Sequence, residues 1–541
     1  MKGSAEVFRM QGKRFCAVVS AVFICFTLMV CDSQGNSVPL TYDEAVKKVT
    51  FTGNVATVDF TNLDNHTIYL VKINSSNSVV PAANTGGVAQ ALPVISSEKE
   101  IGIPFLSEDR LYSFHGAIKE FNANPPRIDM EARHSAILAV NSVSYSVGDK
   151  RTFWVERNVE EGSWEQRPAT LMAAGEYGNI WVTDANTSSG TSENKISTTR
   201  AQEMAGRFDR IYPLTTNLLG YEYGGGPDGD GGMDGDSKIQ ILVYDFYDLD
   251  YGSGGTSYAG YFYSKDFYTQ TELDRSGLQI KTNLAEMFYL NASAVINSPD
   301  FIFSTLIHEF QHMINFNRKF VIQKINSSAW YDEMLSMVAE DVIGPLVGIG
   351  RTNPGHPISV RIPRFLDLYY KHGITEWNNY YPTAYAFGAY LVRNYGGPEL
   401  LKRILDNNKT DVDSITMALK EFSEDMDFNQ ALNRYGEAII FSGSSIPEDG
   451  ANGIGVVTFD KTVTSTVNGQ EYTAYGFNIW QTLRPGTNYR GPLILDLEAA
   501  SMRPHSVIIH SASQWRNKTG DLSVTLEKPS NQNVILFLMA R

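Results

Sequence analysis

Cysteine is scarce in this chain and confined to one end. The 541 residues include three cysteines, and Cys16, Cys25 and Cys31 all lie within the first 31 positions. No thiol follows Cys31, so a protein processed at that point has no internal disulfide. Its stability must come from side-chain packing and from any ions that it binds.

Basic residues are in the minority. The 45 lysines and arginines stand against 60 aspartates and glutamates, which gives a formal net charge of −15. This excess of negative charge argues against nucleic-acid binding and against a polybasic attachment to membranes. Beyond the N-terminal region, no apolar stretch is long enough to cross a bilayer. With 43% hydrophobic and 12% aromatic residues, the chain can form two or three domains with real cores.

The N-terminus has the pattern of an export signal. Four basic residues precede an apolar run over residues 15–30: Lys2, Arg9, Lys13 and Arg14. The run is short for a spanning helix and predicts a secretory signal, with an uncleaved anchor as the alternative. Leu28-Met-Val-Cys31 is similar to a bacterial lipobox with Cys31 as the lipidated first mature residue, although Val30 is bulkier than the small residue usual there. We expect an exported bacterial protein, tethered by lipid at the cell envelope or otherwise secreted.

Histidine is also rare, and one pair of histidines stands out. Among nine histidines, His308 and His312 are the only two at i, i+4 spacing, in the order His-Glu-Phe-Gln-His with Glu309 between them. On a helix these imidazoles lie on one face, one turn apart, and can bind a single metal ion. This is the His-Glu-x-x-His pattern of zinc hydrolases. The alternative is a pair of hydrogen-bonded core histidines.

The residues around this pair predict a helix. Ser298 and Pro299 are typical of a helix start, and residues 301–316 contain neither glycine nor proline. Four apolar residues form a stripe on one side of that helix: Phe303, Ile307, Phe310 and Ile314. The histidines fall roughly 140–180° away from the stripe. The helix therefore buries one side in a core and turns the histidine pair toward something else.

A third metal ligand is available on a second predicted helix, over residues 327–341, which ends near Gly344. Glu333 lies opposite the apolar stripe of this helix, which consists of Tyr331, Leu335, Val338 and Val342. Catalytic zinc takes three protein groups plus water, so Glu333 can complete the set. Its alternative is a solvated helix acid. Glu340 is too far along the axis to bind the same ion together with Glu333, and is the fallback ligand or a hydrogen-bonding partner of a ligand.

The segments 308–316 and 330–341 resemble the gluzincin metallopeptidases and, more narrowly, the hyicolysin-type bacterial secreted metallopeptidases. The resemblance covers roughly residues 145–440 and implies a thermolysin-like zincin core. The zinc ligands that it implies are His308, His312 and Glu333, with Glu309 as the general base. One position departs from the pattern. Thermolysin-like relatives carry an aspartate four residues after the ligand glutamate, which orients a zinc histidine, and Met337 stands there in this chain.

The same resemblance implies a further electrophile. Zinc polarises the scissile carbonyl, and the tetrahedral intermediate needs a second group to stabilise its charge. In related gluzincins this group is a Tyr or His from a later helix. The best candidate is Tyr385, which is followed by Gly388 as in the Tyr-x-x-Gly of aminopeptidase-type gluzincins. The alternative is a core aromatic, and three other residues compete for the role: Tyr381, His356 and His372.

A second candidate site is an acidic, glycine-rich loop over residues 224–236. Four aspartates alternate or nearly alternate along it: Asp228, Asp230, Asp234 and Asp236. Their oxygens can wrap a hard cation such as calcium, and the glycines permit sharp turns. The loop is not an EF-hand, because it lacks the glutamate at position twelve. A calcium ion here would stabilise the fold; the alternative is a solvated acidic turn.

We predict an α+β fold with a thermolysin-like zincin core and β-rich modules at both ends. The boundaries are 1–31 for the signal, 32–80 for a small β module, 81–144 for a linker or pro-segment, 145–442 for the metallopeptidase domain, 443–455 for a linker and 456–541 for a β-sandwich-like module. Residues 258–268 are the predicted edge strand, which would hold a substrate by β-augmentation.

These observations predict a zinc endopeptidase that acts on protein or peptide substrates. One alternative is a retired protease scaffold that serves as a surface binding protein or adhesin. Another is an aminopeptidase, which would require an acidic pocket for a free amine. A membrane would be contacted only through the N-terminal lipid or anchor.

Overall fold

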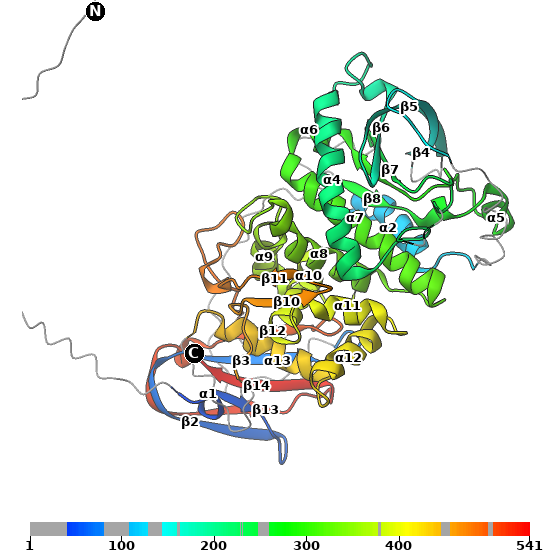
Figure 1. The fold of residues 1–541 in the computed structure, drawn as a ribbon. Coiled ribbons are helices and arrows are strands. Elements are labelled where there is room, and N and C mark those ends of the chain that lie inside the picture. Colours follow the sequence, from blue (N-terminus) through cyan, green and yellow to red (C-terminus); the bar gives the residue numbers. More distant parts are fainter. Residues whose placement is uncertain are drawn as a thin grey trace, which may run out of the picture. The chain divides into compact units, whose positions relative to one another are not determined.

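A computed structural model of the chain (Figure 1) describes residues 40–80, 108–127, 143–158, 163–227, 229, 231–246, 259–376, 380–444, 455–495 and 501–541. The chain divides into two units, Met1–Val38 and Pro39–Arg541. All described residues belong to the second unit. The predicted signal, Cys31, Asp228 and Asp230 lie outside them. Within the described part, no helix is long and apolar enough to span a membrane.

The two ends of the second unit share their β-sheets. One sheet has the order β1-β14-β3-β12, and a two-stranded sheet pairs β2 with β13. Their bounds are β1 Val46–Lys48, β2 Val55–His66, β3 Ile68–Asn74, β12 Val507–His510, β13 Lys518–Glu527 and β14 Val534–Ala540. β3 is buried along its whole length because it is an interior strand, with β14 on one side and β12 on the other. The β modules predicted separately for 32–80 and 456–541 are therefore joined, which periodicity within each segment could not reveal.

A six-stranded mixed sheet supports the central region, in the order β4-β5-β6-β7-β9-β8. Its strands are β4 Lys150–Asn158, β5 Ser163–Ala174, β6 Gly178–Thr183, β7 Ile239–Tyr244, β8 Gly260–Phe262 and β9 Met287–Asn291. The parallel strands β6, β7 and β9 are buried throughout, as expected for strands covered on both faces. β8 lies at the edge of the sheet. The predicted edge strand over 258–268 is thus present but shorter, because a 3₁₀ turn, η2 (Ser264–Phe267), follows it.

Helices cover this sheet and continue beyond it. The longer ones are α2 Glu108–Ala123, α4 Thr198–Leu219, α7 Pro299–Asn315, α8 Ala329–Ile343, α9 Pro357–Leu368, α10 Tyr381–Asn394, α11 Glu399–Asp406, α12 Asp411–Phe422 and α13 Phe428–Phe441. α7 begins at Pro299, as predicted, and continues into a π-helical turn, η3 (Phe316–Ile322). The mixture of helices and sheets is the predicted α+β class.

The remaining elements are short. They comprise α1 Tyr42–Ala45, α5 Gln270–Arg275, α6 Ala292–Asn297, the hairpin of β10 Val463–Val467 and β11 Gln470–Ala474, and the helical turns η1 Asp184–Asn186, η4 Gly344–Val347, η5 Tyr369–Lys371, η6 Ile479–Gln481 and η7 Ser513–Trp515.

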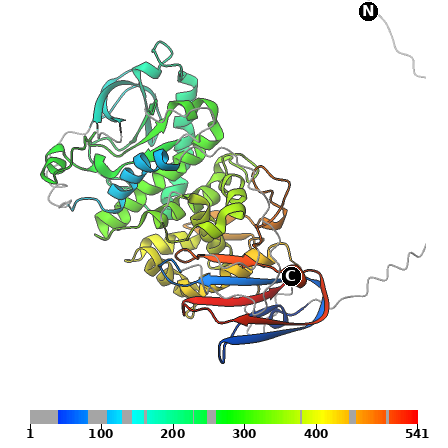
Figure 2. The ribbon, with the colours of Figure 1, turned by 180° about the vertical axis from the view of Figure 1, so that it is seen from behind.

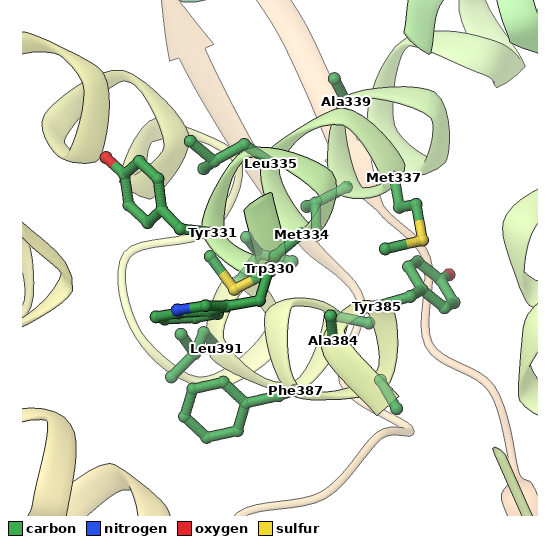
Figure 3. Packing of buried hydrophobic residues seen from close by; sticks show 14 of the residues in the cluster. Trp330, Tyr331, Met334, Leu335, Met337, Ala339, Ala384, Tyr385, Phe387 and Leu391 are labelled. Atoms are coloured by element: carbon green, nitrogen blue, oxygen red, sulfur yellow. The ribbon is translucent and has the colours of Figure 1, made fainter. Parts of the chain in front are cut away.

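α8 and α10 pack tightly against each other through apolar side chains, among them Met334 and Phe387 (Figure 3). Gly388 permits the close approach. A Cβ at this position would lie 2.6 Å from Cγ2 of Val338 and 2.7 Å from Cγ of Met334. This glycine, read from the sequence as part of a functional motif, therefore sets the spacing of two helices and fixes α8 with its Glu333.

Candidate metal centre

Helices α7 and α8 bring together the three predicted ligands. The donor atoms of His308, His312 and Glu333 lie within 4.8 Å of one another, and all three side chains are buried. Nε2 of His308 is 3.0 Å from Oε2 of Glu333, and Nε2 of His312 is 3.5 Å from Oε1. One carboxylate thus lies between two imidazoles that face it with the same ring nitrogen. Two nitrogens and a carboxylate form a donor set that suits zinc.

The other nitrogen of each histidine contacts a second carboxylate. Nδ1 of His308 lies 2.7 Å from Oε1 of Glu340, and Nδ1 of His312 lies 2.9 Å from Oδ2 of Asp332. Glu340 is held in turn by Arg361 at 2.9 Å. Donation of Nδ1–H to a carboxylate leaves the Nε2 lone pair for a metal and fixes the orientation of the ring. The structure therefore fits a bound metal.

Met337 stands where thermolysin-like relatives have an aspartate that orients a zinc histidine, and in this chain other carboxylates contact the two histidines. Met337 is fully buried among apolar side chains, while Glu340 and Asp332 contact the histidines. Glu340 was left open as a fallback ligand or partner, and it is the partner of His308. Asp332 was missed, although its place beside Glu333 in the sequence was an available signal.

The carboxylates give the site a strongly negative potential. Burial opposes protonation of His308, but Glu333 and Glu340 outweigh it and raise the pKa of this imidazole to about 10. Burial likewise lowers the pKa of His312, and the net pKa is raised chiefly by Asp332. Burial raises the pKa of Glu333, but Lys119 and the two histidines hold it well below its ordinary value. A cation is the natural occupant of such a pocket.

Glu309 lies between α7 and the edge strand. Its side chain is buried, and its Oε2 accepts a hydrogen bond from the backbone N–H of Phe262, at 2.8 Å. Gly260 allows α7 to approach β8 here, because a Cβ on it would lie 2.9 Å from Cγ2 of Thr305. The acid adjacent to His308 is therefore held beside the edge of the sheet.

A lysine that no sequence pattern pointed to also enters the site. Lys119 lies on α2, within the stretch 81–144 predicted as a linker or pro-segment. Its Nζ forms an ion pair with Oε1 of Glu333 and lies 3.2 Å from Nε2 of His312. Burial lowers the pKa of Lys119, but Glu333 and Glu309 outweigh this and leave it raised. No local pattern links residue 119 to residues 312 and 333.

The sequence pattern of the family Peptidase M30 matches residues 165–458, which is just over half of the chain. The chain belongs to the peptidase M30 family. It is also 26% identical over 366 residues to the neutral metalloprotease ShpI of Staphylococcus hyicus, covering 64% of this chain and 72% of that protein. The hyicolysin-type resemblance is thereby confirmed, and the protein is a metallopeptidase by family.

In this M30 peptidase Tyr385 is turned away from the role proposed for it. Its hydroxyl donates to Oδ2 of Asp341 at 3.0 Å, deep in the core, and Arg393 contacts the same carboxylate. Tyr381, at the start of α10, lies closer to the ligands, with its ring centroid 6.5 Å from that of His308.

The two histidine rivals lie elsewhere. Nδ1 of His356 accepts from the backbone N–H of Ile358 at the start of α9, and its Nε2 faces Asp341 at 3.8 Å. His372 stacks on Tyr380 with ring centroids 3.7 Å apart.

The two described aspartates of the acidic loop both contact neighbouring polar side chains. Asp234 pairs with Arg151 at 3.0 Å, and Asp236 accepts from Asn179 at 2.8 Å. Asp236 lines a small cavity with two buried acids missed in the sequence, Glu222 and Glu286. Glu286 stands fifty residues after the loop, so no local signal marked it, whereas Glu222 stands two residues before the loop and could have been included.

The buried carboxylates of Glu222 and Glu286 receive few hydrogen bonds. Burial raises the pKa of Glu222 to about 7 and that of Glu286 well above its ordinary value. Both oxygens of Glu286 share one donor, the N–H of Met233. Oε2 of Glu222 has no hydrogen-bond partner within the described part of the chain. Their carboxylates lie against Gly225 and Gly232, where a Cβ would overlap them.

Proposed function

We propose that this M30 peptidase is a zinc-dependent endopeptidase with His308, His312 and Glu333 as the zinc ligands. The convergence of these three donors, with both Nδ1 atoms held by carboxylates, is the observation that carries the proposal. It also favours an enzyme over a retired scaffold, because the three predicted ligands converge and Glu309 is retained beside His308. The core is proposed to be a thermolysin-like zincin.

The chain's own residues divide the work. When bound, zinc supplies a Lewis acid that polarises the scissile carbonyl and lowers the pKa of water. Glu309 accepts the proton of the attacking water and passes it to the leaving amine. The N–H of Phe262 holds the Glu309 carboxylate in place for both transfers. Tyr381 replaces Tyr385 as the proposed group that stabilises the negative charge of the transition state, because its ring lies near His308.

The edge strand β8 and the turn after it are the proposed seat of the substrate backbone. Phe262 O and Ser264 N–H each bond to the side-chain amide of Asn122, at 2.9 and 2.8 Å. The Asn122 amide thus pairs with a backbone carbonyl and a backbone N–H in the way that a peptide group would. This supports binding of an extended peptide along this edge.

We also propose a structural calcium ion at the cavity lined by Glu222, Asp236 and Glu286. Support comes from Oε2 of Glu222, which has no hydrogen-bond partner among the described residues, and from the burial of Glu286 near Asp234, which raises its pKa. Carboxylates and backbone carbonyls are the ligands that calcium prefers. Export, with lipid attached at Cys31, remains a proposal based on the N-terminal sequence.

Metal analysis combined with casein digestion tests the function. The wild type should contain zinc and digest casein, and a chelator should abolish the digestion. Glu309→Gln should keep its zinc and lose cleavage by roughly 10²–10⁴-fold. Glu203→Gln, on the partly exposed surface of α4, is the matched control and should behave as the wild type. Cleavage of an N-terminally blocked peptide distinguishes an endopeptidase from an aminopeptidase. Zinc-free protein that digests casein equally well would overturn the proposal.

A further inference from the structure

We propose that helix α2 keeps the peptidase latent, with the Lys119 ammonium at the metal position and the Asn122 amide at the position of a substrate peptide group. This inference rests on the proposed function of the site. Figure 2 shows α2, in blue, beside the green helices that carry the ligands.

Lys119 occupies the metal position because it uses the ligand atoms themselves. Its Nζ contacts Oε1 of Glu333 and lies within hydrogen-bonding distance, 3.2 Å, of Nε2 of His312. The Nε2 lone pair that accepts from the ammonium is the one that zinc requires. Two cations also cannot share so small a space in a buried pocket without strong repulsion. Lys119 and zinc are therefore alternative occupants.

The Lys119 side chain is enclosed, with 8% of its surface exposed. A lysine this deeply buried requires paired carboxylates. Here the carboxylate it pairs with is the proposed third zinc ligand, so the lysine is stabilised by the same charge that a metal would neutralise.

Asn122 lies one helical turn further along α2 and occupies the substrate edge. Its Nδ2 donates to Phe262 O at 2.9 Å, while its Oδ1 accepts from the backbone N–H and the hydroxyl of Ser264, both at 2.8 Å. One side-chain amide thus satisfies a backbone carbonyl and a backbone amide on the same edge. An extended substrate would need these two groups, so α2 and a substrate compete for them.

Neighbouring contacts seat the helix on both sides of the site. Phe121 lies edge-on to Tyr263 and Tyr268, with ring centroids 5.2 and 5.8 Å away. Arg127, just beyond α2, donates to the backbone of Lys324 at 2.7 Å. α2 thus bridges the region after β8 and the segment before α8.

Release of α2 need not unfold the rest of the N-terminal region. β3, upstream of α2, is an interior strand between β12 and β14. The described contacts of Lys119 and Asn122 with the site are made by side chains, whereas β3 is held by two ladders of backbone hydrogen bonds. The helix can therefore leave the site while the terminal sheet stays intact.

We call this blocking of the site by Lys119 and Asn122 of α2 the latch. The zinc affinity of full-length variants tests it directly. Lys119→Met removes the competing cation, so the zinc Kd, measured by chelator competition, should fall by at least about tenfold. Backbone amide hydrogen exchange over residues 116–123 should be faster in zinc-bound Lys119→Met than in the wild type. Glu120→Gln changes one charge at an exposed neighbouring position of α2 and should match the wild type in both measurements. A zinc Kd for Lys119→Met that is unchanged or higher overturns the proposal.

Peptide cleavage separates failure of the latch from failure of the proposed function. If α2 acts as the latch, Lys119→Met and Asn122→Ala should both cleave a peptide substrate faster than the wild type at limiting zinc and substrate. Asn122→Ala leaves every charge in place, so it repeats the test if Lys119→Met folds poorly. Tighter zinc binding without any cleavage would support the latch and refute the peptidase. Normal zinc binding with reduced cleavage in Lys119→Met would make Lys119 part of the working site and overturn the latch.

Discussion

Nδ1 of His308 lies 2.7 Å from Oε1 of Glu340, although Glu340 stands about two turns beyond Glu333 on α8. The two glutamates therefore hold opposite nitrogens of one imidazole, since Oε2 of Glu333 faces Nε2 at 3.0 Å. Arg361 and Ser304 fix the Glu340 carboxylate from its other sides. A single helix thus supplies both the proposed third ligand and a carboxylate that contacts the proposed first ligand.

Glu340→Gln should weaken zinc binding by about 10–100-fold, because the amide holds the His308 ring less firmly and supports its basicity less. Equilibrium competition with a chelator measures the effect. Asp332→Asn should act in the same direction through His312. Unchanged zinc affinity in both variants would show that these carboxylates do not position the ligands.

The two tyrosines of α10 should behave differently. Tyr381→Phe should lower kcat by roughly 10²–10³-fold with zinc retained, if its hydroxyl stabilises transition-state charge. Tyr385→Phe should keep kcat and lose about 1–2 kcal/mol of unfolding free energy, because a buried hydrogen bond to Asp341 is lost. Steady-state kinetics measures kcat and urea titration measures the unfolding free energy of both variants. A catalytic defect in Tyr385→Phe alone would assign the charge-stabilising role to Tyr385 instead of Tyr381.

Gly388→Ala should destabilise the protein by about 1–3 kcal/mol, since the added Cβ overlaps Val338 and Met334. Gly206→Ala, on α4, is a suitable control because nothing lies within 4 Å of its Cβ position. That change should stabilise by up to about 1 kcal/mol through helix propensity. Thermal unfolding of the two variants should therefore shift in opposite directions, and equal shifts would contradict the account of α8–α10 packing.

Calcium should stabilise the wild type but not Glu286→Gln. Without calcium, the burial that raises the pKa of Glu286 above its ordinary value also disfavours its charged form, so replacement by a neutral glutamine should change the unfolding free energy little. With calcium at about 100 times its Kd, the wild type alone should gain about 2.7 kcal/mol. Calorimetry with calcium and with a calcium-selective chelator measures this. A calcium effect that persists in Glu286→Gln would place the ion elsewhere.

Stability should fall with acidity through His505. Burial lowers the pKa of its imidazole from the ordinary 6.5 to about 4. The unfolded chain takes up the proton near pH 6.5 and the folded chain only near pH 4, so acidification through that window favours unfolding. Allowing for partial hydration, the effect is about 2 kcal/mol.

His505→Gln removes the titrating group and offers an amide oxygen to Thr375, the present partner of Nδ1 at 2.6 Å. Urea unfolding at pH 7 and pH 4.5 should show a smaller loss for this variant than for the wild type. Equal losses would mean that other groups cause the acid sensitivity.

Local sequence patterns predicted the parts of the site that lie within one helix. The His308–His312 spacing and the position of Glu333 opposite the apolar stripe of α8 follow from helical periodicity, and the start of α7 follows from Ser298 and Pro299. Sequence patterns also predicted the edge strand over 258–268, close to the observed β8. The convergence of these residues needed only two adjacent helices, which short connections favour.

What the sequence could not provide depends on long-range pairing. Lys119 meets Glu333 across more than two hundred residues, and β3 pairs with β14 from the opposite end of the chain. The hydrogen bond from Tyr385 to Asp341 could not be predicted, because helical position alone does not show which group accepts from the hydroxyl. Each of these outcomes is decided by tertiary packing, which periodicity within a segment does not encode.

Anomalous diffraction at the zinc edge, from crystals grown with saturating zinc, would locate the metal itself. We expect one strong peak about 2.0–2.2 Å from Nε2 of His308, Nε2 of His312 and a carboxylate oxygen of Glu333, with the Lys119 ammonium displaced. No peak there, or a zinc ion bound away from these three side chains, would contradict the proposed metal site.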